Sequence, residues 1–471
     1  MYKSMIDYTA TYTDQYQLTM SQVYFLKGQK DNIAVFDYFF RTLPFNGGYA
    51  IFAGLEDLLN TLGTLKFDAS DLDYLKQKGF HPEFIDYLKN FRFKGTIYSS
   101  REGDLVFPTR PILQVEGNII EAQIIETILL NILNFQTLIA TKASRMREAA
   151  GNRQLIDFGL RRAQGPGGYY ASRAAFIGGF EATSNVRAGR DYDIPLSGTM
   201  AHSYIESYDD ELTSFRDFAE VHPDNCILLV DTYDTLKSGL PNAIIVAKEM
   251  EIKGLRIKGI RLDSGDLAYL AKMSRNMLDE AGLAYVKIAV SNQLDEYIIK
   301  SLMEQHAPID VFGVGTSLVT GHPDAALDGV YKLAFANGEP RIKLSENVSK
   351  TTLPHRKQVY RTVDNNGHFI GSDVVTLASE QEVEIMHHPM YKDKSLSIGK
   401  YKKEPLLEKV MKDGVRLTKR QSLSEIATYS MERLKNLPEE YQRFNYPHIY
   451  KIGLSTSLLA ERDRLIAKHK I

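Results

Sequence analysis

Two pairs of acidic residues directly follow short apolar runs of the chain, where a carboxylate needs a polar partner. Asp231 and Asp234 come after CILLV, and Asp263 and Asp266 come after IKGIRL. A carboxylate at the end of a buried strand is costly unless it binds a cation, a hydroxyl group or a base. One such acid alone is more typical of a helix N-cap. Two pairs at separate strand ends favour a site for a polyol or for a metal-bound phosphate.

Basic and aromatic side chains occupy similar places. Arg261 lies two residues before Asp263, so both side chains face the same way from a strand. They fit a structural ion pair or a site for a zwitterionic or ribosyl-phosphate ligand, and the spacing leaves both open. Phe158 and Arg161 of DFGLRRAQG fit a flat, anionic heteroaromatic ligand, through stacking and a bidentate contact. A core phenylalanine and a surface arginine fit that pattern equally well.

Glycines and one histidine complete the candidates. Gly313 and Gly315 precede Thr316 in DVFGVGTSLVTG, where backbone N–H groups could approach an anion closely. No GK[ST] follows, so this is not a Walker A motif, and a plain tight turn is the commoner meaning of such glycines. His202 of SGTMAHS lies among small residues that leave an imidazole accessible. No second histidine or cysteine has metal-ligand spacing to it, and the sequence does not choose its orienting acid.

Most of these candidates stand in one recurring pattern, a short apolar run that ends in polar residues. The runs cover residues 154–162, 226–234, 257–266, 286–292 and 310–316. Helical patterns separate the runs after residue 230, and this alternation is typical of parallel βαβ units. A closed barrel and an open doubly wound sheet both produce it. In both, ligands bind at the carboxyl ends of the strands, where the candidates lie.

The flanking regions predict other elements. From residue 120 to Gly151 the pattern predicts one long helix or two abutting helices. After residue 330, NG and NNG turns between alternating apolar residues predict hairpins. The stretch 421–471 has a helical pattern, and the sequence leaves open whether it forms a third domain or packs on the first. Before residue 120 the chain predicts an α+β region, with helices over 14–28 and 53–62, a strand over 33–41 and short antiparallel strands over 94–117.

The bulk composition argues against several classes of protein. The 471 residues carry 57 basic and 59 acidic side chains, a balance unlike that of nucleic-acid or polybasic membrane binders. The single cysteine, Cys226, forms no intrachain disulfide, as is usual in a reducing compartment. The N-terminal sequence has no apolar core of a signal peptide, and no stretch reaches the ~18 apolar residues of a membrane helix. We therefore expect a cytoplasmic protein of two or three domains.

Ten motifs in a fixed order resemble the nicotinate phosphoribosyltransferase family over nearly the whole chain. They are TDQYQLTM, FDYFFRTLPFNGGYAIFAGLE, EGDLVFPTRPILQVEG, DFGLRRAQG, GGFEATSNV, SGTMAHS, LLVDTYDT, IRLDSGDL, FGVGTSL and VYKLA. The resemblance implies a type II phosphoribosyltransferase fold, an irregular α/β barrel with an N-terminal α+β domain and C-terminal wrapping segments. The expected domains are 1–125 (N-terminal α+β), 126–345 (catalytic barrel) and 346–471 (C-terminal region packed on the other two).

The resemblance also implies a reaction and an assembly. Nicotinate and phosphoribosyl pyrophosphate (PRPP) would give nicotinate mononucleotide and pyrophosphate, coupled to ATP hydrolysis through a phosphohistidine. Mg²⁺ would enter with PRPP and ATP rather than in a fixed protein-only metal site. The family works as a homodimer, in which the N-terminal domain completes the partner's active site.

The family's functional residues map onto this chain motif by motif. His202 would be phosphorylated by ATP, and Asp231 would pair with its imidazole. Phe158 and Tyr16, the latter from the partner subunit, would sandwich the nicotinate ring, and Arg161 would contact its carboxylate. The phosphoribosyl site would consist of Arg261, Asp263 and Gly265 at the ribose and phosphate, Gly313, Gly315 and Thr316 at the 5′-phosphate, Arg41 from the partner, and Lys332 and Lys343 as added positive charge.

Ser184 distinguishes two related substrates. The similar nicotinamide phosphoribosyltransferases carry an aspartate in a GTDT motif, and ATSN places Ser184 at that position here. An aspartate would repel the carboxylate of nicotinate, whereas a serine hydroxyl donates to it. Nicotinate is therefore the expected base. The alternatives are a nicotinamide phosphoribosyltransferase and a non-catalytic nucleotide-binding relative, while a quinolinate phosphoribosyltransferase would be shorter and more basic.

Overall fold

The computed structural model divides the chain into two compact units. Unit 2 consists of Lys142–Ala325, and unit 1 consists of the two flanking segments, Met1–Thr141 and Ala326–Ile471. Unit 1 is thus built from both ends of the chain. The residues that the structure describes are 5–344, 350–391 and 393–469. The expected three-domain division, with limits at residues 125 and 345, stays a prediction.

Unit 2 contains a parallel sheet of six strands that curls into an incomplete barrel. The order of the strands is β7-β6-β11-β10-β9-β8, so β8 to β11 are neighbours in chain order and β11 returns to β6. The barrel is open between β7 and β8, which stand at the two ends of this order. The expected irregular α/β barrel is confirmed. The strands are β6 (Gln154–Asp157), β7 (Ala182–Thr183), β8 (Ile227–Leu229), β9 (Gly259–Leu262), β10 (Lys287–Ser291) and β11 (Val311–Val314).

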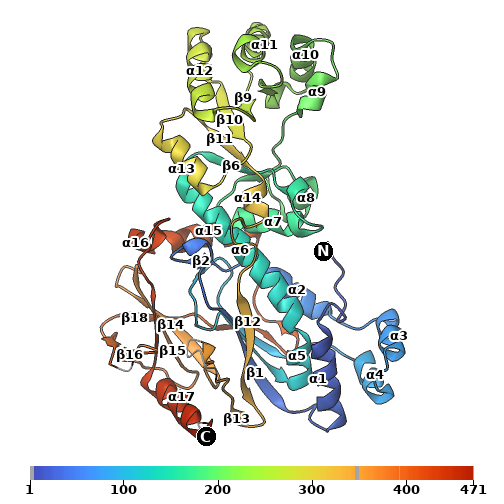
Figure 1. The fold of residues 1–471 in the computed structure, drawn as a ribbon, viewed down its shortest axis with the longest axis vertical. Coiled ribbons are helices and arrows are strands. Elements are labelled where there is room, and N and C mark those ends of the chain that lie inside the picture. Colours follow the sequence, from blue (N-terminus) through green and yellow to red (C-terminus); the bar gives the residue numbers. More distant parts are fainter. Residues whose placement is uncertain (1–4, 345–349, 392, 470–471) are drawn as a thin grey trace. The chain divides into compact units, whose positions relative to one another are not determined.

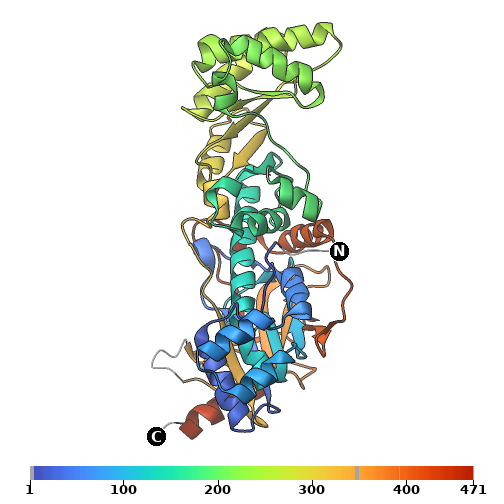
Figure 2. The ribbon, with the colours of Figure 1, turned by 90° about the vertical axis from the view of Figure 1, so that its right-hand side faces the viewer.

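Helices connect these strands, and acidic side chains cap several of them. Asp266 caps α12 (Leu267–Glu280) by accepting the N–H of Tyr269 at 3.0 Å, and Asp295 caps α13 (Glu296–Glu304) in the same way. α12 lies beside β9 and β10 (Figures 1 and 2). The other helical segments of unit 2 include η2 (Leu160–Arg162), α7 (Gly167–Ile177), α8 (Val186–Tyr192), α9 (His202–Glu206), α10 (Glu211–Val221), η4 (Thr235–Gly239), α11 (Leu240–Ile252) and α14 (Thr316–Val319).

Unit 1 contains an antiparallel seven-stranded sheet to which both ends of the chain contribute. Its order is β13-β12-β1-β5-β3-β19-β20, so strands from the second half of the chain flank the N-terminal strands on both sides. Figure 1 shows β1 in blue and β12 in orange, which pair with each other, and β19 pairs with β3. The strands are β1 (Ile33–Phe40), β3 (Thr96–Ser99), β5 (Leu113–Asn118), β12 (Gly329–Ala336), β13 (Glu339–Pro340), β19 (Glu408–Lys412) and β20 (Val415–Arg416).

The N-terminal helices and strands agree with the sequence pattern. The abutting helices expected before Gly151 are α5 (Ile119–Ile124) and α6 (Glu126–Ala150), and α6 contains the boundary between the units. Leu58 and Leu129 are fully buried members of the apolar core of unit 1. The remaining N-terminal elements are α1 (Gln15–Leu26), η1 (Pro44–Asn46), β2 (Ala50–Ile51), α2 (Leu55–Thr64), α3 (Ala69–Gln77), α4 (Pro82–Lys89) and β4 (Leu105–Val106).

The C-terminal part of unit 1 forms a second sheet of six strands. The hairpins expected at the NG and NNG turns are confirmed, as β12–β13 and as β14–β15. The 421–471 stretch, for which we expected helices, also holds a strand, β21, that pairs in parallel with β15. The elements are β14 (Lys357–Val363), β15 (Phe369–Leu377), β16 (Ile385–His387), β17 (Ser395–Ser397), β18 (Lys402–Pro405), α15 (Leu423–Lys435), α16 (Glu439–Gln442), β21 (Lys451–Leu454) and α17 (Thr456–His469).

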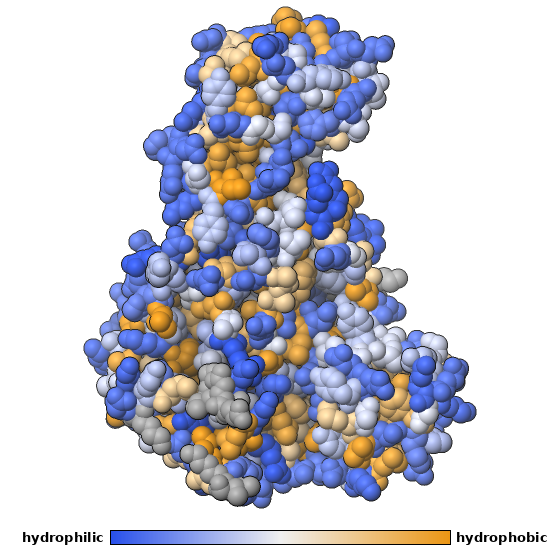
Figure 3. All heavy atoms as spheres, viewed as in Figure 1, coloured by the Kyte–Doolittle hydropathy of each residue, from blue (hydrophilic) through white to orange (hydrophobic). Residues whose placement is uncertain are grey.

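One face of the molecule is mostly polar, with dispersed apolar residues. Figure 3 shows hydrophilic side chains over most of the face that is drawn, with apolar residues in small patches between them. Among the described residues, no helix is both long enough and apolar enough to cross a membrane.

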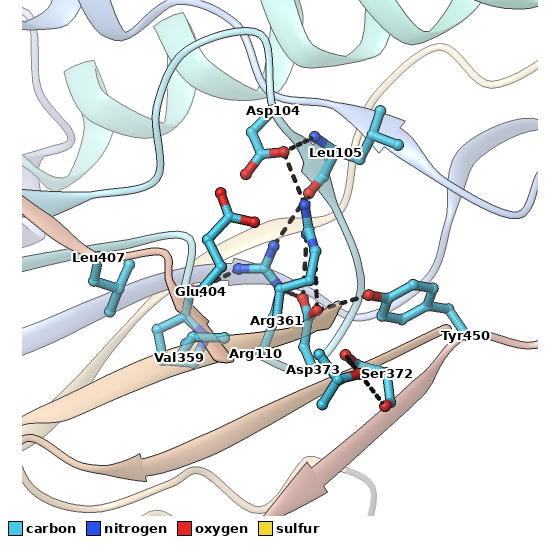
Figure 4. Close-up of polar contacts among 12 residues, drawn as sticks. Asp104, Leu105, Arg110, Val359, Arg361, Ser372, Asp373, Glu404, Leu407 and Tyr450 are labelled. Atoms are coloured by element: carbon cyan, nitrogen blue, oxygen red, sulfur yellow. Dashed lines mark hydrogen bonds and ion pairs between the residues drawn. The ribbon is translucent and has the colours of Figure 1, made fainter. Parts of the chain in front are cut away.

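A buried ion-pair network joins the two chain segments of unit 1. Arg361 of β14 donates to Asp104 at 2.8 Å and to Asp373 of β15 at 3.1 Å (Figure 4). Arg433 of α15 also donates to Asp104, at 2.8 Å, and Nε of Arg110 lies 2.8 Å from Oδ2 of Asp373. Side chains from before residue 111 and after residue 360 therefore neutralise one another in the interior.

The network favours the ionised form of Asp104. Burial would raise the pKa of this carboxyl, but Arg361 and Arg433 outweigh burial and hold the pKa below its usual value. Because the pKa is lower in the folded chain than in the unfolded chain, the ion pairs stabilise the fold above the unfolded pKa of about 3.9. That contribution is lost as the pH falls through the folded-state pKa.

We predict that Asp104→Asn destabilises unit 1 by about 3–5 kcal/mol near pH 7, because it leaves Arg361 and Arg433 buried beside a neutral partner. Urea unfolding followed by circular dichroism measures the loss. The difference from the unchanged protein should narrow once the pH falls below about 4, where Asp104 of the unfolded chain becomes protonated, and should close as the pH falls through the lower folded-state pKa.

Asp86→Asn is the matched control. Asp86 pairs with Lys89 at 2.7 Å on the surface, where solvent screens the charges, so its unfolding midpoint should not move. Equal effects of the two substitutions would contradict the role assigned to the network.

Candidate active site

The ring of Phe158 lies against Gly313 at the carboxyl ends of β6 and β11. A Cβ atom at position 313 would stand 2.3 Å from Cε2 of Phe158, so only glycine leaves room for the ring. The backbone of Gly313 is also aligned in the sheet with Ser291 of β10 and Ile156 of β6. Gly313 thus makes space for an aromatic side chain, and its role in a phosphate cradle stays a prediction.

Gly315 and Thr316 stand at the tip of β11. Gly315 is the N-cap of the four-residue helix α14, and a Cβ atom on it would lie 3.4 Å from the carbonyl oxygen of Phe158. Thr316, the first residue of α14, is exposed. Gly315 therefore lies beside the backbone of Phe158, and Thr316 after it is open to solvent, as a ligand-binding position requires.

The four acids at the strand ends divide into two kinds. Asp234 caps η4 by accepting the N–H groups of Leu236 and Lys237, and Asp266 caps α12, so the N-cap interpretation holds for these two. Asp231 and Asp263 cap no helix and contact other side chains at the strand ends. Oδ2 of Asp231 accepts the N–H of Asp263 and the hydroxyl of Ser264, both at 2.7 Å. Its Oδ1 is buried and has no hydrogen-bond partner in the described part of the chain.

Arg261 extends from β9 beside Asp263. Its Nη1 donates to the hydroxyl of Thr199 and to the carbonyl of Met200, while its Nη2 lies 3.9 Å from Oδ1 of Asp263. Burial lowers the pKa of the guanidinium, and Asp263 and Asp231 partly offset that effect. Its Nε is buried without a hydrogen-bond partner among the described residues. An unsatisfied buried donor of this kind is a position that a ligand oxygen would satisfy.

His202 begins α9 and reaches the same strand ends. Its Nδ1 is 3.0 Å from the hydroxyl of Thr232, and its Nε2 is 3.8 Å from Oδ2 of Asp263. The predicted pair between His202 and Asp231 does not occur among the described contacts, in which Asp231 accepts from Asp263 and Ser264. Asp263 is the carboxylate that faces the imidazole.

The remaining predicted residues of unit 2 lie around this group. Arg161 is exposed in η2, and its positive charge adds to the lowering of the pKa of Arg261. Ser184 is half-buried after β7, and its N–H donates to the carbonyl of Asp157 at 2.9 Å. Gly265 is exposed in the turn after β9 with a φ of +77°, a left-handed conformation that favours glycine.

Contacts connect four of the predicted residues of unit 2 into one chain of neighbours. The ring of Phe158 packs on Gly313, which stands beside Ser291 in the sheet. The hydroxyl of Ser291 donates to Asp263, which faces His202. An aromatic ring, a guanidinium, two carboxylates and an imidazole therefore share the carboxyl edge of one sheet.

Four predicted residues belong to unit 1 and form a group of their own. The hydroxyl of Tyr16 donates to Glu126 at 3.3 Å, and burial together with Glu126 raises the pKa of Tyr16 to about 12. Burial lowers the pKa of Lys332, Glu126 opposes this, and the charges of Arg41 and Lys343 add to the lowering. Tyr16 and Lys332 thus share the Glu126 carboxylate, and Arg41 and Lys343 lie near enough to Lys332 for their charges to act on it.

Several site residues were missed in the sequence. Ser291 and Thr232 hold Asp263 and His202, and Asp157 lies fully buried at the end of β6. The position of Ser291 at the tip of the apolar run VKIAVS was the available signal. Thr232 had no signal of its own, because the sequence does not place the loop that carries His202.

Two further observations concern a cavity away from the site and the possibility of a metal-binding cluster. A cavity of about 780 Å³ in unit 1 is lined by side chains that include Phe25, Tyr87 and Glu121, and none of the predicted site residues lines it. Within the described ranges, no group of three or more histidine, cysteine, aspartate or glutamate side chains is placed to hold a metal ion.

Models of one protein family match the segments of the chain that contain the candidate site residues. Three family models match: the nicotinate phosphoribosyltransferase (NAPRTase) N-terminal domain over residues 11–134, the NAPRTase family over 153–368 and the NAPRTase C-terminal domain over 356–461. Nicotinate phosphoribosyltransferase of Bacillus subtilis (strain 168) is 46% identical over 476 residues, which cover 98% of this chain and 96% of the relative. The Caenorhabditis elegans enzyme is 37% identical over 95% of this chain and 91% of its own length.

Solved structures agree with the sequence relatives. Human nicotinic acid phosphoribosyltransferase superposes with a TM-score of 0.87 at 30% identity, over 96% of this chain and 99% of the human one. The nicotinate-nucleotide pyrophosphorylase from Pyrococcus furiosus gives 0.72 at 26% identity, over 91% and 95%. The chain belongs to the nicotinate phosphoribosyltransferase family and is a phosphoribosyltransferase enzyme.

Proposed function

We propose that this chain transfers the phosphoribosyl group of PRPP to nicotinate and couples the transfer to ATP hydrolysis. The observation that carries the proposal is a pair of buried atoms of opposite charge, Nε of Arg261 and Oδ1 of Asp231, that lack partners among the described residues. Each would cost free energy in an empty interior. Both stand at the strand ends that also hold Phe158 and Asp263, so one polar, anionic sugar ligand accounts for them together.

The base would bind at the β6 end of the site. Phe158 offers a ring face for stacking, and the exposed guanidinium of Arg161 provides two parallel donors for the carboxylate of nicotinate. The hydroxyl of Ser184 adds a third donor. These contacts would hold the pyridine nitrogen toward the sugar.

The phosphoribosyl group would bind toward β9 and β11. Asp263 would accept from the ribose hydroxyls, Arg261 would donate to a phosphate oxygen, and the N-terminal end of α14 at Gly315 and Thr316 would receive the 5′-phosphate. The bond from C1′ to pyrophosphate breaks and a bond from C1′ to the pyridine nitrogen forms. Positioning and electrostatic stabilisation by these residues supply the rate gain.

Mg²⁺ would enter as part of the PRPP and ATP substrates. Carboxylate oxygens are the ligands that it prefers, and Oδ1 of Asp231 is a carboxylate oxygen with no hydrogen bond in the described chain. When bound, the ion neutralises charge on the leaving pyrophosphate. Asp231 would therefore hold the substrate-bound ion while its Oδ2 keeps the turn before Ser264 in place.

ATP coupling would use His202 as the phosphoryl acceptor. Nδ1 of His202 forms a hydrogen bond with the hydroxyl of Thr232, so Nε2 is the nitrogen that faces Asp263 at the strand ends. The bond between the γ-phosphorus and the leaving ADP oxygen breaks as a bond to Nε2 forms, and water later hydrolyses the phosphohistidine. Charge repulsion between the phosphoryl group and Asp263, 3.8 Å from Nε2, would change how tightly the ribose is held.

The active form would be a cytoplasmic homodimer. Tyr16 and Arg41 would come from unit 1 of a second copy, Tyr16 to cover the nicotinate ring and Arg41 to approach the phosphate. Tyr16 donates to Glu126, and Arg41 lies near enough to Lys332 for the two charges to repel, so this part of unit 1 would bring positive charge to the phosphate.

We predict that His202→Ala reduces nicotinate-dependent ATP hydrolysis to background and leaves slow, ATP-independent transfer. ADP release and nicotinate mononucleotide formation, measured with and without ATP, check it. His222→Ala, an exposed histidine that packs on Phe218, is the control and should keep full coupling. Intact coupling in the His202 variant would remove the phosphohistidine from the mechanism.

The alternative substrate, nicotinamide, is tested at Ser184. Ser184→Asp should lower kcat/KM for nicotinate by about two orders of magnitude, the scale of repulsion between two carboxylates near a protein surface. The same change should improve kcat/KM for nicotinamide, and Ser184→Ala should weaken nicotinate without that gain. A non-catalytic relative would release no pyrophosphate with either base, and a Ser184→Asp variant that still prefers nicotinate would contradict our account of selectivity.

Gly313→Ala tests the aromatic shelf. The added methyl group would displace the Phe158 ring, so KM for nicotinate should rise about 3- to 10-fold, the value of one stacking contact. KM for PRPP should stay the same. Gly63→Ala, where a Cβ meets no atom within 4 Å, is the control and should leave both constants unchanged. A rise in KM for PRPP alone would contradict the role of Gly313 beneath the Phe158 ring and would support its predicted role in phosphate binding.

A further inference from the structure

A buried carboxylate stands behind the proposed nicotinate site without a charged partner. Asp157, the last residue of β6, is 1% exposed and accepts three hydrogen bonds, from the N–H of Gly159 at 2.8 Å and from the hydroxyls of Ser172 at 2.7 Å and Thr183 at 2.8 Å. No lysine or arginine pairs with it in the described ranges. Burial raises the pKa of this carboxyl, and the three donors lower it.

The three donors belong to three different elements. Gly159 starts the turn that continues into η2, Ser172 lies in α7, and Thr183 ends β7. Asp157 also uses its own carbonyl, which accepts the N–H of Ser184 at 2.9 Å. The carboxylate and the carbonyl of one residue therefore tie together the segments that follow β6 and β7.

These segments carry the groups proposed to bind the base. Phe158 follows Asp157 directly, Arg161 lies two residues after Gly159, and Ser184 follows Thr183. The network continues beyond them, because the hydroxyl of Thr183 also accepts the N–H of Asn185, at 3.0 Å. The bonds of Asp157 with Gly159, Ser172 and Thr183 are buried, so water does not compete with them.

We propose that Asp157 is the positioning residue of the nicotinate site, which fixes Phe158, Arg161 and Ser184 relative to one another. A buried, unpaired carboxylate is unfavourable for stability, and an apolar side chain would fill the same place at lower cost. What the carboxylate adds is geometry, since two oxygen atoms hold three donors in fixed directions. The proposal rests on the function proposed above and adds a residue that never touches the substrate.

A purely structural role makes a different prediction. It would lower stability and reduce the use of both substrates together. A positioning role acts on the base alone, because Arg261 and Asp263, which we assign to the phosphoribosyl group, have no hydrogen bond with this network. The split between KM for nicotinate and KM for PRPP therefore separates the two roles.

Thr183→Val is the main variant, because valine keeps the branched shape and removes only the hydroxyl. KM for nicotinate should rise about 5- to 100-fold, the range expected when a buried acceptor loses a donor. KM for PRPP should change by less than about twofold, within the uncertainty of such comparisons. Thr183→Ser, which keeps the hydroxyl, should restore most of the nicotinate affinity, and Asp157→Asn should show the same split as Thr183→Val.

Asp310→Asn is the matched control. Asp310 is also an acceptor of a backbone N–H, from Ile288 at 2.9 Å, and it lies just before β11, at the opposite end of the strands. Its substitution removes a similar interaction and should leave both KM values unchanged. Circular dichroism of each variant verifies that it is folded.

Each outcome supports or overturns the proposal. Selective loss of nicotinate affinity in Thr183→Val and Asp157→Asn, with recovery in Thr183→Ser, supports it. Equal changes in both KM values, no change, or no difference between valine and serine at position 183 would overturn it. If the unchanged protein forms no nicotinate mononucleotide, the proposed function itself fails, and that result is distinct from any of these.

Discussion

Parallel pairing of the unit 2 strands places all their carboxyl ends at one edge of the sheet, and the candidate site depends on that constraint. Phe158 and Arg261 are far apart in sequence, yet β6 and β9 are separated in the sheet only by β11 and β10. The contacts across these strands, from the Phe158 ring through Gly313 and Ser291 to Asp263, follow from register rather than from any local motif. A one-residue slip would turn alternate side chains to the other face and separate them.

The sequence predicted the elements and the types of chemistry better than the individual partners. Apolar runs with polar ends identified β6 and β8 to β11, because strand burial leaves a strong local pattern. Which acid caps a helix was not predictable, since Asp231 and Asp234 follow the same run. The structure separates them by the direction of each side chain. The same limit applies to the contact between His202 and Thr232, which needs the course of the loop before α9.

Distance along the chain explains what was missed in unit 1. β21 lies in a stretch with a helical pattern, and its pairing with β15 comes from tertiary context, which overrides weak local preference. The network of Asp104, Arg361 and Asp373 joins residues more than 250 positions apart. A single sequence gives no sign that a buried arginine will meet a buried aspartate. Such pairs carry a desolvation cost that only their full mutual satisfaction offsets.

The buried carboxylates of the scaffold differ from two buried groups of the candidate site in how fully the chain satisfies them. In unit 1 the carboxylates of Asp104 and Asp373 have arginine partners, and in unit 2 Asp157 has three donors, so these groups need no ligand. Arg261 and Asp231 differ, because each keeps one buried polar atom without a hydrogen bond among the described residues. Native chains rarely leave such atoms unpaired unless something else satisfies them. Under the proposed function, the substrate would satisfy these two atoms, whereas the carboxylates of Asp104, Asp373 and Asp157 are satisfied within the chain.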